Sequence, residues 1–445
     1  MRPGPTNIGD TVACLQQANN TFKDAFGPIH GRDVVRYFVP GRIEVLGKHT
    51  DYAGGRSLLA ATSCGVVVIS AGNGTNQVRM ANADPRFPKA SFPLSVEIDI
   101  PIGPWTNYPM TVARRLARNF AGDTNLQGVD IAFASDLPGA SGMSSSSAMV
   151  VASYFAIAEP NRLAELPKYK ANIQTPEDLA MYLACNENGR SFRALDGDRG
   201  VGTFGGSEDH TAILCCQPGR LSNYSFCPTR FERHVPFPDD FVFVVCHSGV
   251  TAEKTGQALE KYNAVSARAR KACAVYNAHY RTQHETLADI VRENTSLGCP
   301  AMLDKFGAIP HRVDSTEALL DRFFQFVTES EEIIPRASDA LAKGNLEEFG
   351  KWVDMSHENS RRLLWNIVPE IDFLQQNARA LGAIAASGFG AGFGGSAYAV
   401  VHRGEADRFS RAWQEHYLAK FPQYRGHARC LTTCPTGAAH RMELA

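Results

Sequence analysis

One short segment, residues 137–148, constrains this chain more than any other, because glycines and four consecutive serines stand between a strand pattern and a helix pattern. Apolar alternation over 129–134 predicts the strand, and the small apolar residues of 148–157 predict the helix. A helix N-terminus offers unpaired backbone N–H groups and the positive end of the helix dipole. The segment therefore predicts a phosphate-binding loop, in which a serine hydroxyl can ligate Mg²⁺. The alternative is a serine-rich turn and helix cap.

Length and composition limit the class of protein. The 445 residues are too many for one ordinary core and predict two domains. A net charge of -1 argues against a nucleic-acid partner. The first ten residues lack the layout of a secretion signal, and no apolar run approaches the roughly 18 residues of a membrane helix. We therefore expect a cytoplasmic protein with no membrane partner. The 11 cysteines show no metal-binding spacing, which predicts reduced, buried thiols.

Short strands and long helices alternate without a regular repeat. Predicted strands fall at 34–38, 65–71, 77–81, 91–98, 129–134, 241–246, 397–402 and 428–431, and residues 211–216 and 221–226 predict a hairpin. Predicted helices fall at 110–120, 147–157, 176–191, 252–280, 315–342 (kinked at Pro335), 346–364 and 370–381. The mixture indicates an α+β protein. The charged, proline-containing stretch 231–240 predicts a boundary between an N-terminal domain, 1–232, and a C-terminal domain, 233–445.

A polar loop, residues 40–55, follows the first predicted strand. It gathers cations, an imidazole and carboxylates between glycines, which suits a polyhydroxylated ligand whose hydroxyls both donate and accept hydrogen bonds. A solvated surface loop is the alternative. The segment from Gly41 to His49 is not a Walker A loop, because its glycine spacing differs and His49 stands where that motif has Ser or Thr.

Two further glycine-rich segments complete the set. Residues 205–210 place Asp209, a carboxylate available as a base or an orienting group, directly after two glycines. Residues 387–396 interleave glycines with aromatic residues and lead into a predicted strand, so this loop can lie against a phosphate or a second backbone. Each segment is also compatible with an ordinary turn.

Segments 40–55, 137–148 and 387–396, in this order, resemble the three motifs of the GHMP small-molecule kinases. The first is similar to the galactokinase signature G-R-x-N-(apolar)-(apolar)-G-E-H-x-D-Y. Supporting similarities lie at Phe22, Phe26, Tyr262, 356–358 and 368–372. The resemblance implies a two-domain GHMP architecture with the active site in the cleft between the domains. It also implies an ATP- and Mg²⁺-dependent kinase acting on the anomeric (C1) hydroxyl of galactose or a galactose-like sugar.

The resemblance also assigns residues. It implies that Asp209 and Arg42 are catalytic, and that the sugar contacts are Lys48, His49, Asp51, Gly206 and Tyr262. The ATP-binding residues would be Gly139, Ser141, Gly142, Met143, Ser144, Ser145 and Ser146. Mg²⁺ would be held by Ser146 and Glu187, although an insertion at about 193–203 lengthens the interval to Asp209. The resemblance implies nothing about the oligomeric state.

Three departures keep other functions open. Lys48 and Glu44 stand where galactokinases carry Glu and Asn, and Glu208-Asp209-His210 replaces Met-Asp-Gln. An ammonium group in place of a carboxylate would suit a sugar with an anionic C6, such as galacturonate, unless Lys48 and Glu44 only neutralise each other. A non-catalytic sensor of sugar and ATP is a third alternative. The unbroken serine segment and the presence of Asp209 favour an enzyme.

Overall fold

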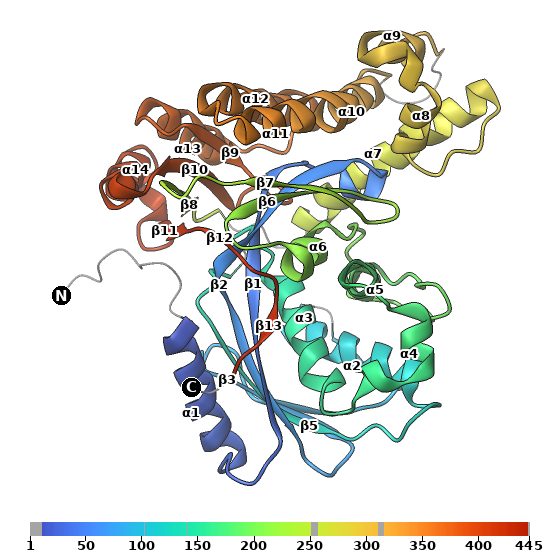
Figure 1. The fold of residues 1–445 in the computed structure, drawn as a ribbon, viewed down its shortest axis with the longest axis vertical. Coiled ribbons are helices and arrows are strands. Elements are labelled where there is room, and N and C mark those ends of the chain that lie inside the picture. Colours follow the sequence, from blue (N-terminus) through green and yellow to red (C-terminus); the bar gives the residue numbers. More distant parts are fainter. Residues whose placement is uncertain (1–10, 102, 140, 251–256, 310–315, 444–445) are drawn as a thin grey trace.

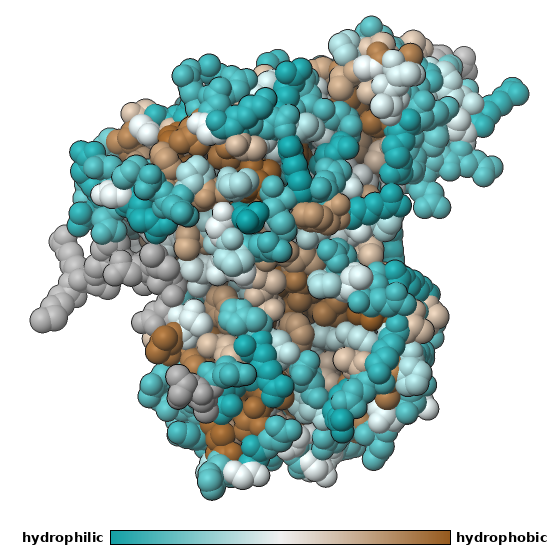
Figure 2. Space-filling model, in the orientation of Figure 1, coloured by the Kyte–Doolittle hydropathy of each residue, from teal (hydrophilic) through white to brown (hydrophobic). Residues whose placement is uncertain are grey.

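The computed structural model describes residues 11–101, 103–139, 141–250, 257–309 and 316–443 (Figure 1). Strands and helices form an α+β molecule with two sheets, as the sequence predicts. Within the described residues, none of the helices combines the length and apolar character needed to cross a membrane. On the face drawn in Figure 2, hydrophilic residues cover most of the surface, and hydrophobic residues gather mainly in the middle and at the lower left.

The larger sheet carries the first half of the chain. Its main order is β13-β1-β2-β5-β3-β4, with β12 and β6 also paired to β2, and β7 paired to β6. These strands are β1 (Val34–Leu46), β2 (Arg56–Gly72), β3 (Gln77–Asn82), β4 (Ala90–Pro93), β5 (Val129–Ser135), β6 (Arg220–Ser225), β7 (Arg230–Pro236), β12 (Pro435–Thr436) and β13 (His440–Arg441). The predicted strand at 91–98 is shorter, ending at Pro93.

Helices cover both faces of this sheet. Alternate residues of β2 point to opposite sides, so that Val67 and Ile69 pack against α1 (Thr11–Phe26), whereas Val66 and Val68 join the main core. The other face is covered by α2 (Asn107–Phe120) and α3 (Ser145–Ala158), with α4 (Pro167–Asn172) and α5 (Pro176–Asn188) beyond them (Figure 1). The serine segment thus begins a helix that is buried against the sheet.

The smaller sheet has the order β11-β8-β10-β9. It is formed by β8 (Phe241–His247), β9 (Ala385–Gly388), β10 (Ser396–His402) and β11 (Arg429–Thr433), and it packs against α13 (Pro369–Ala380) and α14 (Ala406–Lys420). Cys246 and Cys430 are directly opposed on β8 and β11 and form a disulfide. The expectation of reduced thiols throughout is therefore wrong at this pair, which sequence spacing does not reveal because the partners are 184 residues apart.

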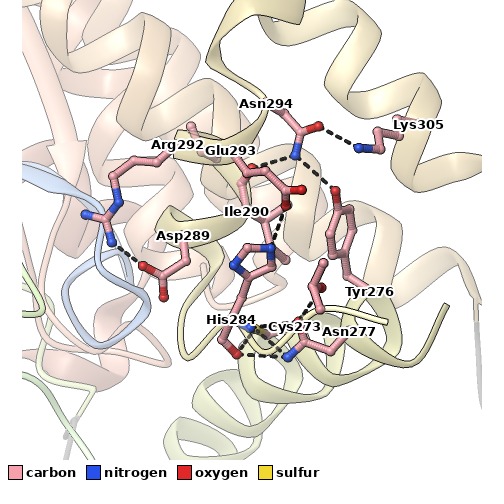
Figure 3. Close-up of polar contacts among 12 residues, drawn as sticks. Cys273, Tyr276, Asn277, His284, Asp289, Ile290, Arg292, Glu293, Asn294 and Lys305 are labelled. Carbon is pink, nitrogen blue, oxygen red and sulfur yellow. Dashed lines mark hydrogen bonds and ion pairs between the residues drawn. The ribbon is translucent and has the colours of Figure 1, made fainter. Parts of the chain in front are cut away.

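Helices α7 (Gln257–Tyr280), α8 (Leu287–Glu293), α9 (Gly298–Gly307) and α10 (Thr316–Val327) form an arm at the upper right of Figure 1. Their own apolar core includes Tyr276 and Phe306 and extends to Ala53. Figure 3 shows the polar contacts that tie α7 to α8 and α9. Asn294 donates to the hydroxyl of Tyr276 and accepts from Lys305, at 3.0 and 2.7 Å. These contacts hold the helices of the arm together, and its apolar core brings it against Ala53.

A π-helical segment, Thr328–Ile333, joins α10 to α11 (Ile334–Ala342), whose first turn contains Pro335, the position where the sequence predicts a kink. A second one, Ser360–Leu364, follows α12 (Leu346–Asn359). Predicted helix residues 252–256 and 315 lie outside the described residues.

The predicted hairpin of 211–216 and 221–226 is wrong in its first half. Residues Glu208–Cys215 form helix α6, and the hairpin is made by β6 and β7. The short apolar run of 211–216 has the length of a strand, and periodicity alone does not separate a buried strand from a buried helix turn. The expected domain boundary, 232/233, falls inside β7, whose partner β6 belongs to the larger sheet. We propose that the division lies between β7 and β8.

Candidate active site

Strand β1 carries Arg42 and Glu44 into a pocket between the larger sheet and loops from the second half of the chain. Two residues apart on a strand, these side chains point to the same side. The pocket is lined by Arg42, Glu44, His49, Asp51, Tyr52, Ser147, Glu187, Thr203, Gly205, Gly206, Glu208, Asp209, His210, Tyr262, Gly390 and Ala391. Residues from all four segments singled out in the sequence therefore meet in one place.

Arg42 links three of these segments. Its Nε donates to Asp209 Oδ1 at 2.7 Å, and its Nη2 lies 2.6 Å from the same oxygen. Its Nη1 donates to the carbonyl oxygen of Gly142, and its backbone N–H donates to Met143 O at 3.2 Å. Residues 137–147 are called the serine loop below. The Arg42 guanidinium thus holds the Asp209 carboxylate, at the start of α6, against this loop.

Electrostatics keep Arg42 charged in spite of its burial. Loss of solvent alone would lower the pKa of Arg42, but the neighbouring carboxyl groups of Asp209, Glu208 and Glu44 outweigh that effect and raise it. The side chain is only 5% exposed, whereas that of Asp209 is 17% exposed. Asp209 therefore reaches the open part of the pocket, and Arg42 supports it from behind.

Ser147 and Glu187 lie beside Asp209. The Ser147 hydroxyl, in the first turn of α3, donates to Glu187 Oε1 at 2.7 Å and lies 3.3 Å from Asp209 Oδ2. Thr203 donates to the other oxygen of Glu187 at 3.2 Å. Glu187, predicted from the resemblance, is therefore brought to the site, and the 193–203 insertion supplies one of its partners. Ser147 and Thr203 were missed by the sequence analysis, although Ser147 is the fourth serine of the motif.

Two residues of the serine loop have a positive φ angle, a backbone region that glycine adopts without strain. Gly142 has φ of 80°, and Ser144, at the N-cap of α3, has φ of 57°. Ser141 donates to Pro138 O at 2.7 Å, while its own carbonyl accepts from Ser396 at 2.6 Å. The glycine-rich loop of 388–395 packs directly on Gly142, since a Cβ on Gly390 would lie 2.9 Å from the Gly142 oxygen. The second and third motifs are thus one structural unit.

Not every predicted residue of the serine loop presents its side chain to the cavity. Met143 is fully buried in the main core and can contribute only its backbone. Gly139 is exposed, and Ser145 and Ser146 are half-buried. Neither of those two hydroxyls makes a hydrogen bond with a described residue, whereas the hydroxyl of Ser141 is engaged in its own turn. Ser145 and Ser146, together with Ser144, whose buried hydroxyl also has no partner among the described residues, are therefore the hydroxyls left for a ligand.

The opposite wall of the pocket is the acceptor loop, defined here as residues 47–55. His49 Nε2 donates to Ala391 O at 3.2 Å, and its Nδ1 accepts from the Tyr52 hydroxyl at 2.8 Å. Burial, followed by the nearby Arg322, lowers the pKa of His49 to about 3. His49 is therefore a neutral imidazole with one fixed tautomer, whose ring lies 5.4 Å from that of Tyr262.

Asp51 and Gly206 approach each other so closely that a side chain at position 206 would not fit. A Cβ there would lie 2.4 Å from Asp51 Oδ2. The backbone N–H of Glu208 points to the same oxygen at 3.4 Å. Asp51 is 8% exposed, so its carboxylate is held at the edge of the cavity by the start of α6.

Lys48 does not line the pocket. Its side chain is 1% exposed, and its ammonium group donates to the Ser356 hydroxyl at 3.2 Å, on α12. Ser356 in turn donates to Glu329 at 2.8 Å, which also accepts from the backbone N–H of Gly47. The prediction of a sugar contact at Lys48 is therefore not supported by its position, because the side chain turns from the loop into a buried polar cluster.

Two buried glutamates form the floor of the pocket. Glu44 and Glu208 are each 4% exposed, and Glu208 Oε2 accepts from Ser57 at 2.7 Å. Burial raises the pKa of Glu44 to about 7, against the opposing effect of Lys48 and Arg42. Burial and then the neighbouring Glu44 raise the pKa of Glu208 well above its usual range. In the sequence, Glu44 and Glu208 were noted only because they differ from the residues that galactokinases carry at these positions.

Comparison with known families gives three matches along the chain. Residues 20–71 match the galactokinase galactose-binding signature, 107–176 match the GHMP kinase N-terminal domain, and 337–419 match the GHMP kinase C-terminal domain. The first contains the acceptor loop, and the second contains the serine loop.

Similar proteins extend over almost the whole chain. The galactokinase of Dictyostelium discoideum is 24% identical over 93% of this chain and 90% of its own length, and that of Roseiflexus sp. is 28% identical over 89% and 90%. The crystal structure of Lactococcus lactis galactokinase complexed with galactose has a TM-score of 0.76 at 23% identity, covering 96% of this chain and 100% of that one. Methanococcus jannaschii mevalonate kinase follows the same fold with a TM-score of 0.55 at 13% identity, over 92% and 100%.

Proposed function

Since the chain belongs to the GHMP kinase family, we propose that it transfers the terminal phosphoryl group of ATP to the anomeric hydroxyl of galactose or a galactose-like sugar. The products are ADP and the sugar 1-phosphate. Matches to galactokinases along the chain support a sugar kinase of this specificity. The site residues and their roles below are part of the proposal.

The observation that carries the proposal is the double contact of Arg42. One guanidinium binds Asp209 and the Gly142 carbonyl of the serine loop, so an acceptor held next to Asp209 also lies next to the phosphate-binding end of α3. Phosphoryl transfer depends mainly on such positioning and on charge stabilisation.

In this mechanism the acceptor hydroxyl donates a hydrogen bond to Asp209. The Asp209 carboxylate orients the hydroxyl and accepts its proton as the oxygen–phosphorus bond forms. Arg42 keeps Asp209 ionised and can stabilise negative charge on the transferring group. The N–H groups at the start of α3 hold the phosphates of ATP.

Mg²⁺ fits the oxygen donors at this place. The Glu187 carboxylate and the hydroxyls that open α3 are hard oxygen ligands of the kind that Mg²⁺ takes. Ser147 already contacts Glu187, and the hydroxyl of Ser146, the predicted ligand, makes no hydrogen bond with a described residue. We propose that Glu187 and Ser146 hold the ion and that Ser147 orients Glu187. When bound, Mg²⁺ neutralises charge on the phosphates.

The galacturonate alternative depended on Lys48, and the position of that side chain removes its support. The ammonium group lies on Ser356 outside the pocket, and the pocket wall carries carboxyl groups instead. The sensor alternative requires a damaged phosphate site. The serine loop and Asp209 are joined through Arg42, which favours an enzyme.

A coupled ADP-release assay with ATP, Mg²⁺ and a panel of sugars tests the proposal. Galactose or a close analogue should give the highest kcat/KM, and phosphorus NMR should place the product phosphate on the anomeric carbon. Calorimetric binding of galactose without ADP release would point to the sensor. Turnover of mevalonate or homoserine in preference to every hexose would also contradict the proposal.

A further inference from the structure

The wall of the pocket is far more acidic than a neutral sugar requires. Five carboxyl groups line it, against one guanidinium, that of Arg42. They belong to Glu44, Asp51, Glu187, Glu208 and Asp209. The imidazole of His49 adds no positive charge, because burial lowers its pKa to about 3. Glu187 and Asp209 have roles in phosphoryl transfer and Asp51 is an expected sugar contact, which leaves the floor, Glu44 and Glu208, without a role.

The floor glutamates are built as a pair. Burial raises the pKa of both carboxyl groups, and Glu44 adds to the rise at Glu208, so the pair holds a proton near neutral pH. Glu208 also accepts from Ser57. Glu44 Oε1, by contrast, is buried and has no hydrogen-bond partner among the described residues. A buried carboxyl oxygen without a donor is costly, so a pocket ligand that donates to it would be bound favourably.

Nearby cations do not satisfy Glu44 directly. Lys48 lowers the pKa of Glu44 through space, but its ammonium group donates to Ser356. Arg42 directs its donors to Asp209 and Gly142. Among the described residues, no group of three or more His, Cys, Asp or Glu side chains is placed to hold a metal ion beside Glu44. The missing partner is therefore a donor that enters with the acceptor substrate.

We propose that the Glu44–Glu208 pair selects an amino sugar, a galactose-like hexose in which a primary ammonium group replaces one hydroxyl. This inference rests on the proposed kinase function and narrows its substrate class. The ammonium group donates to Glu44 Oε1 and replaces the shared proton of the pair, which is released to solvent. No bond other than the hydrogen bonds changes in this step.

An ammonium group fits this floor better than a hydroxyl does. A hydroxyl can donate to Glu44, but it leaves the two carboxyl groups dependent on their shared proton. An ammonium group supplies three donors and a positive charge, and charge-assisted hydrogen bonds are about twice as strong as neutral ones. A sugar carboxylate would face like charges, so the same floor disfavours a uronate.

The kinetic test compares galactosamine and 6-amino-6-deoxygalactose with galactose. For at least one amino sugar, kcat/KM should equal or exceed that for galactose, and Glu44→Gln should lower this ratio about tenfold or more. Asp130→Asn is the matched control, because Asp130 is a buried carboxylate on β5 that does not line the pocket, and it should leave the ratio unchanged. Galactose turnover with both amino sugars at least tenfold poorer overturns the inference and leaves the kinase proposal intact.

A binding measurement on the unsubstituted protein avoids any effect of the variants on folding. Calorimetry at pH 7 in two buffers with different ionisation enthalpies should show close to one proton released per amino sugar bound, and none per galactose bound. Equal proton release for the two sugars, or an unchanged kinetic ratio in Glu44→Gln, would contradict the exchange of the ammonium group for the shared proton.

Discussion

The acceptor loop and the serine loop face each other across one pocket but are built in opposite ways. The acceptor loop is clasped by helices from much later in the chain. Arg322 donates to His49 O at 2.5 Å, Gln325 donates to Lys48 O at 3.1 Å, and Glu329 accepts from Gly47 N at 2.8 Å. Its polar groups are thus satisfied before any ligand arrives.

In the serine loop, the hydrogen bonds to other parts of the protein involve mainly its first half. Arg42, Ser141 and Ser396 hold its first half, but the buried hydroxyl of Ser144 has no partner among the described residues. Ser144 also makes no side-chain cap to α3. The difference indicates that the backbone of the acceptor loop is held in place by other parts of the protein, whereas the phosphate side keeps unpaired hydroxyl groups that a nucleotide can bind.

The strongest challenge to this comparison is Asp209→Ala, which removes the group at the meeting point of the two loops. We expect kcat to fall by a factor on the order of 10² to 10⁴, the usual contribution of a positioned acid–base group. The KM values for sugar and ATP should change much less. Steady-state kinetics measure all three, and near-normal turnover would remove Asp209 from the mechanism.

Arg322→Met tests whether the clasp on the acceptor loop matters for the sugar. Arg322 is fully buried, and its loss leaves the His49 carbonyl unpaired. A hydrogen bond to a charged group is worth about 1.5–3 kcal/mol, so KM for the sugar should rise about tenfold to a hundredfold while KM for ATP changes little. Arg336→Met, at an exposed arginine on α11, is the control. An equal rise in both KM values would show that the two loops are not independent.

Substitutions of the serines in α3 can separate a direct Mg²⁺ ligand from a residue that only orients Glu187. Ser146→Ala should raise the Mg²⁺ concentration for half-maximal activity about tenfold, and Ser147→Ala should do so to a lesser degree, through Glu187. Ser153→Ala removes a buried hydroxyl further along the same helix and serves as the control. If only Ser147→Ala raises the Mg²⁺ concentration for half-maximal activity, Ser146 is not a ligand of the metal. If neither differs from the control, the site is placed wrongly.

The smallest effect concerns pH, and it arises on the acceptor side. With a pKa of about 3 when folded and about 6.5 when unfolded, His49 binds its proton mainly in the unfolded state. The free energy of unfolding should therefore fall as pH drops through this window, by at most about 1.4 kcal/mol per pH unit. Urea titrations of the protein and of His49→Gln should diverge below pH 6. Parallel curves would mean that His49 is not buried as described.

Glu44 should act in the opposite direction. Its pKa rises to about 7 on folding, so the folded state holds the proton between about 4.5 and 7, and stability should fall as pH rises through that range. Glu44→Gln should remove this loss. The same urea titrations measure it, and an unchanged slope in the variant would argue against the shared proton.

Local patterns were sufficient to predict the serine loop, the strand and the helix that flank it, and the acceptor segment, because each depends on neighbouring residues. They failed where distant residues decide the outcome. The motif predicted Lys48 as a sugar contact, but in the structure its ammonium group donates to Ser356 of α12, outside the pocket. The part of helix α6 from Thr211 onward was mistaken for a strand because a short, mostly apolar, buried run fits either a strand or a helix turn. The Cys246–Cys430 pair depends on the register of β8 and β11, which spacing does not encode.

Strand β1, which carries Arg42, pairs on one side with β13, a strand close to the C-terminal end of the described residues. Residues His440 and Arg441 of β13 pair with Phe38 and Tyr37 of β1, so most of the chain must be synthesised before that side of β1 is covered. Until then β1 presents an open edge on the ribosome, where exposed strands invite pairing with other chains. Expression of shortened forms that stop before residue 440 would be expected to yield aggregates more readily than weakened enzyme.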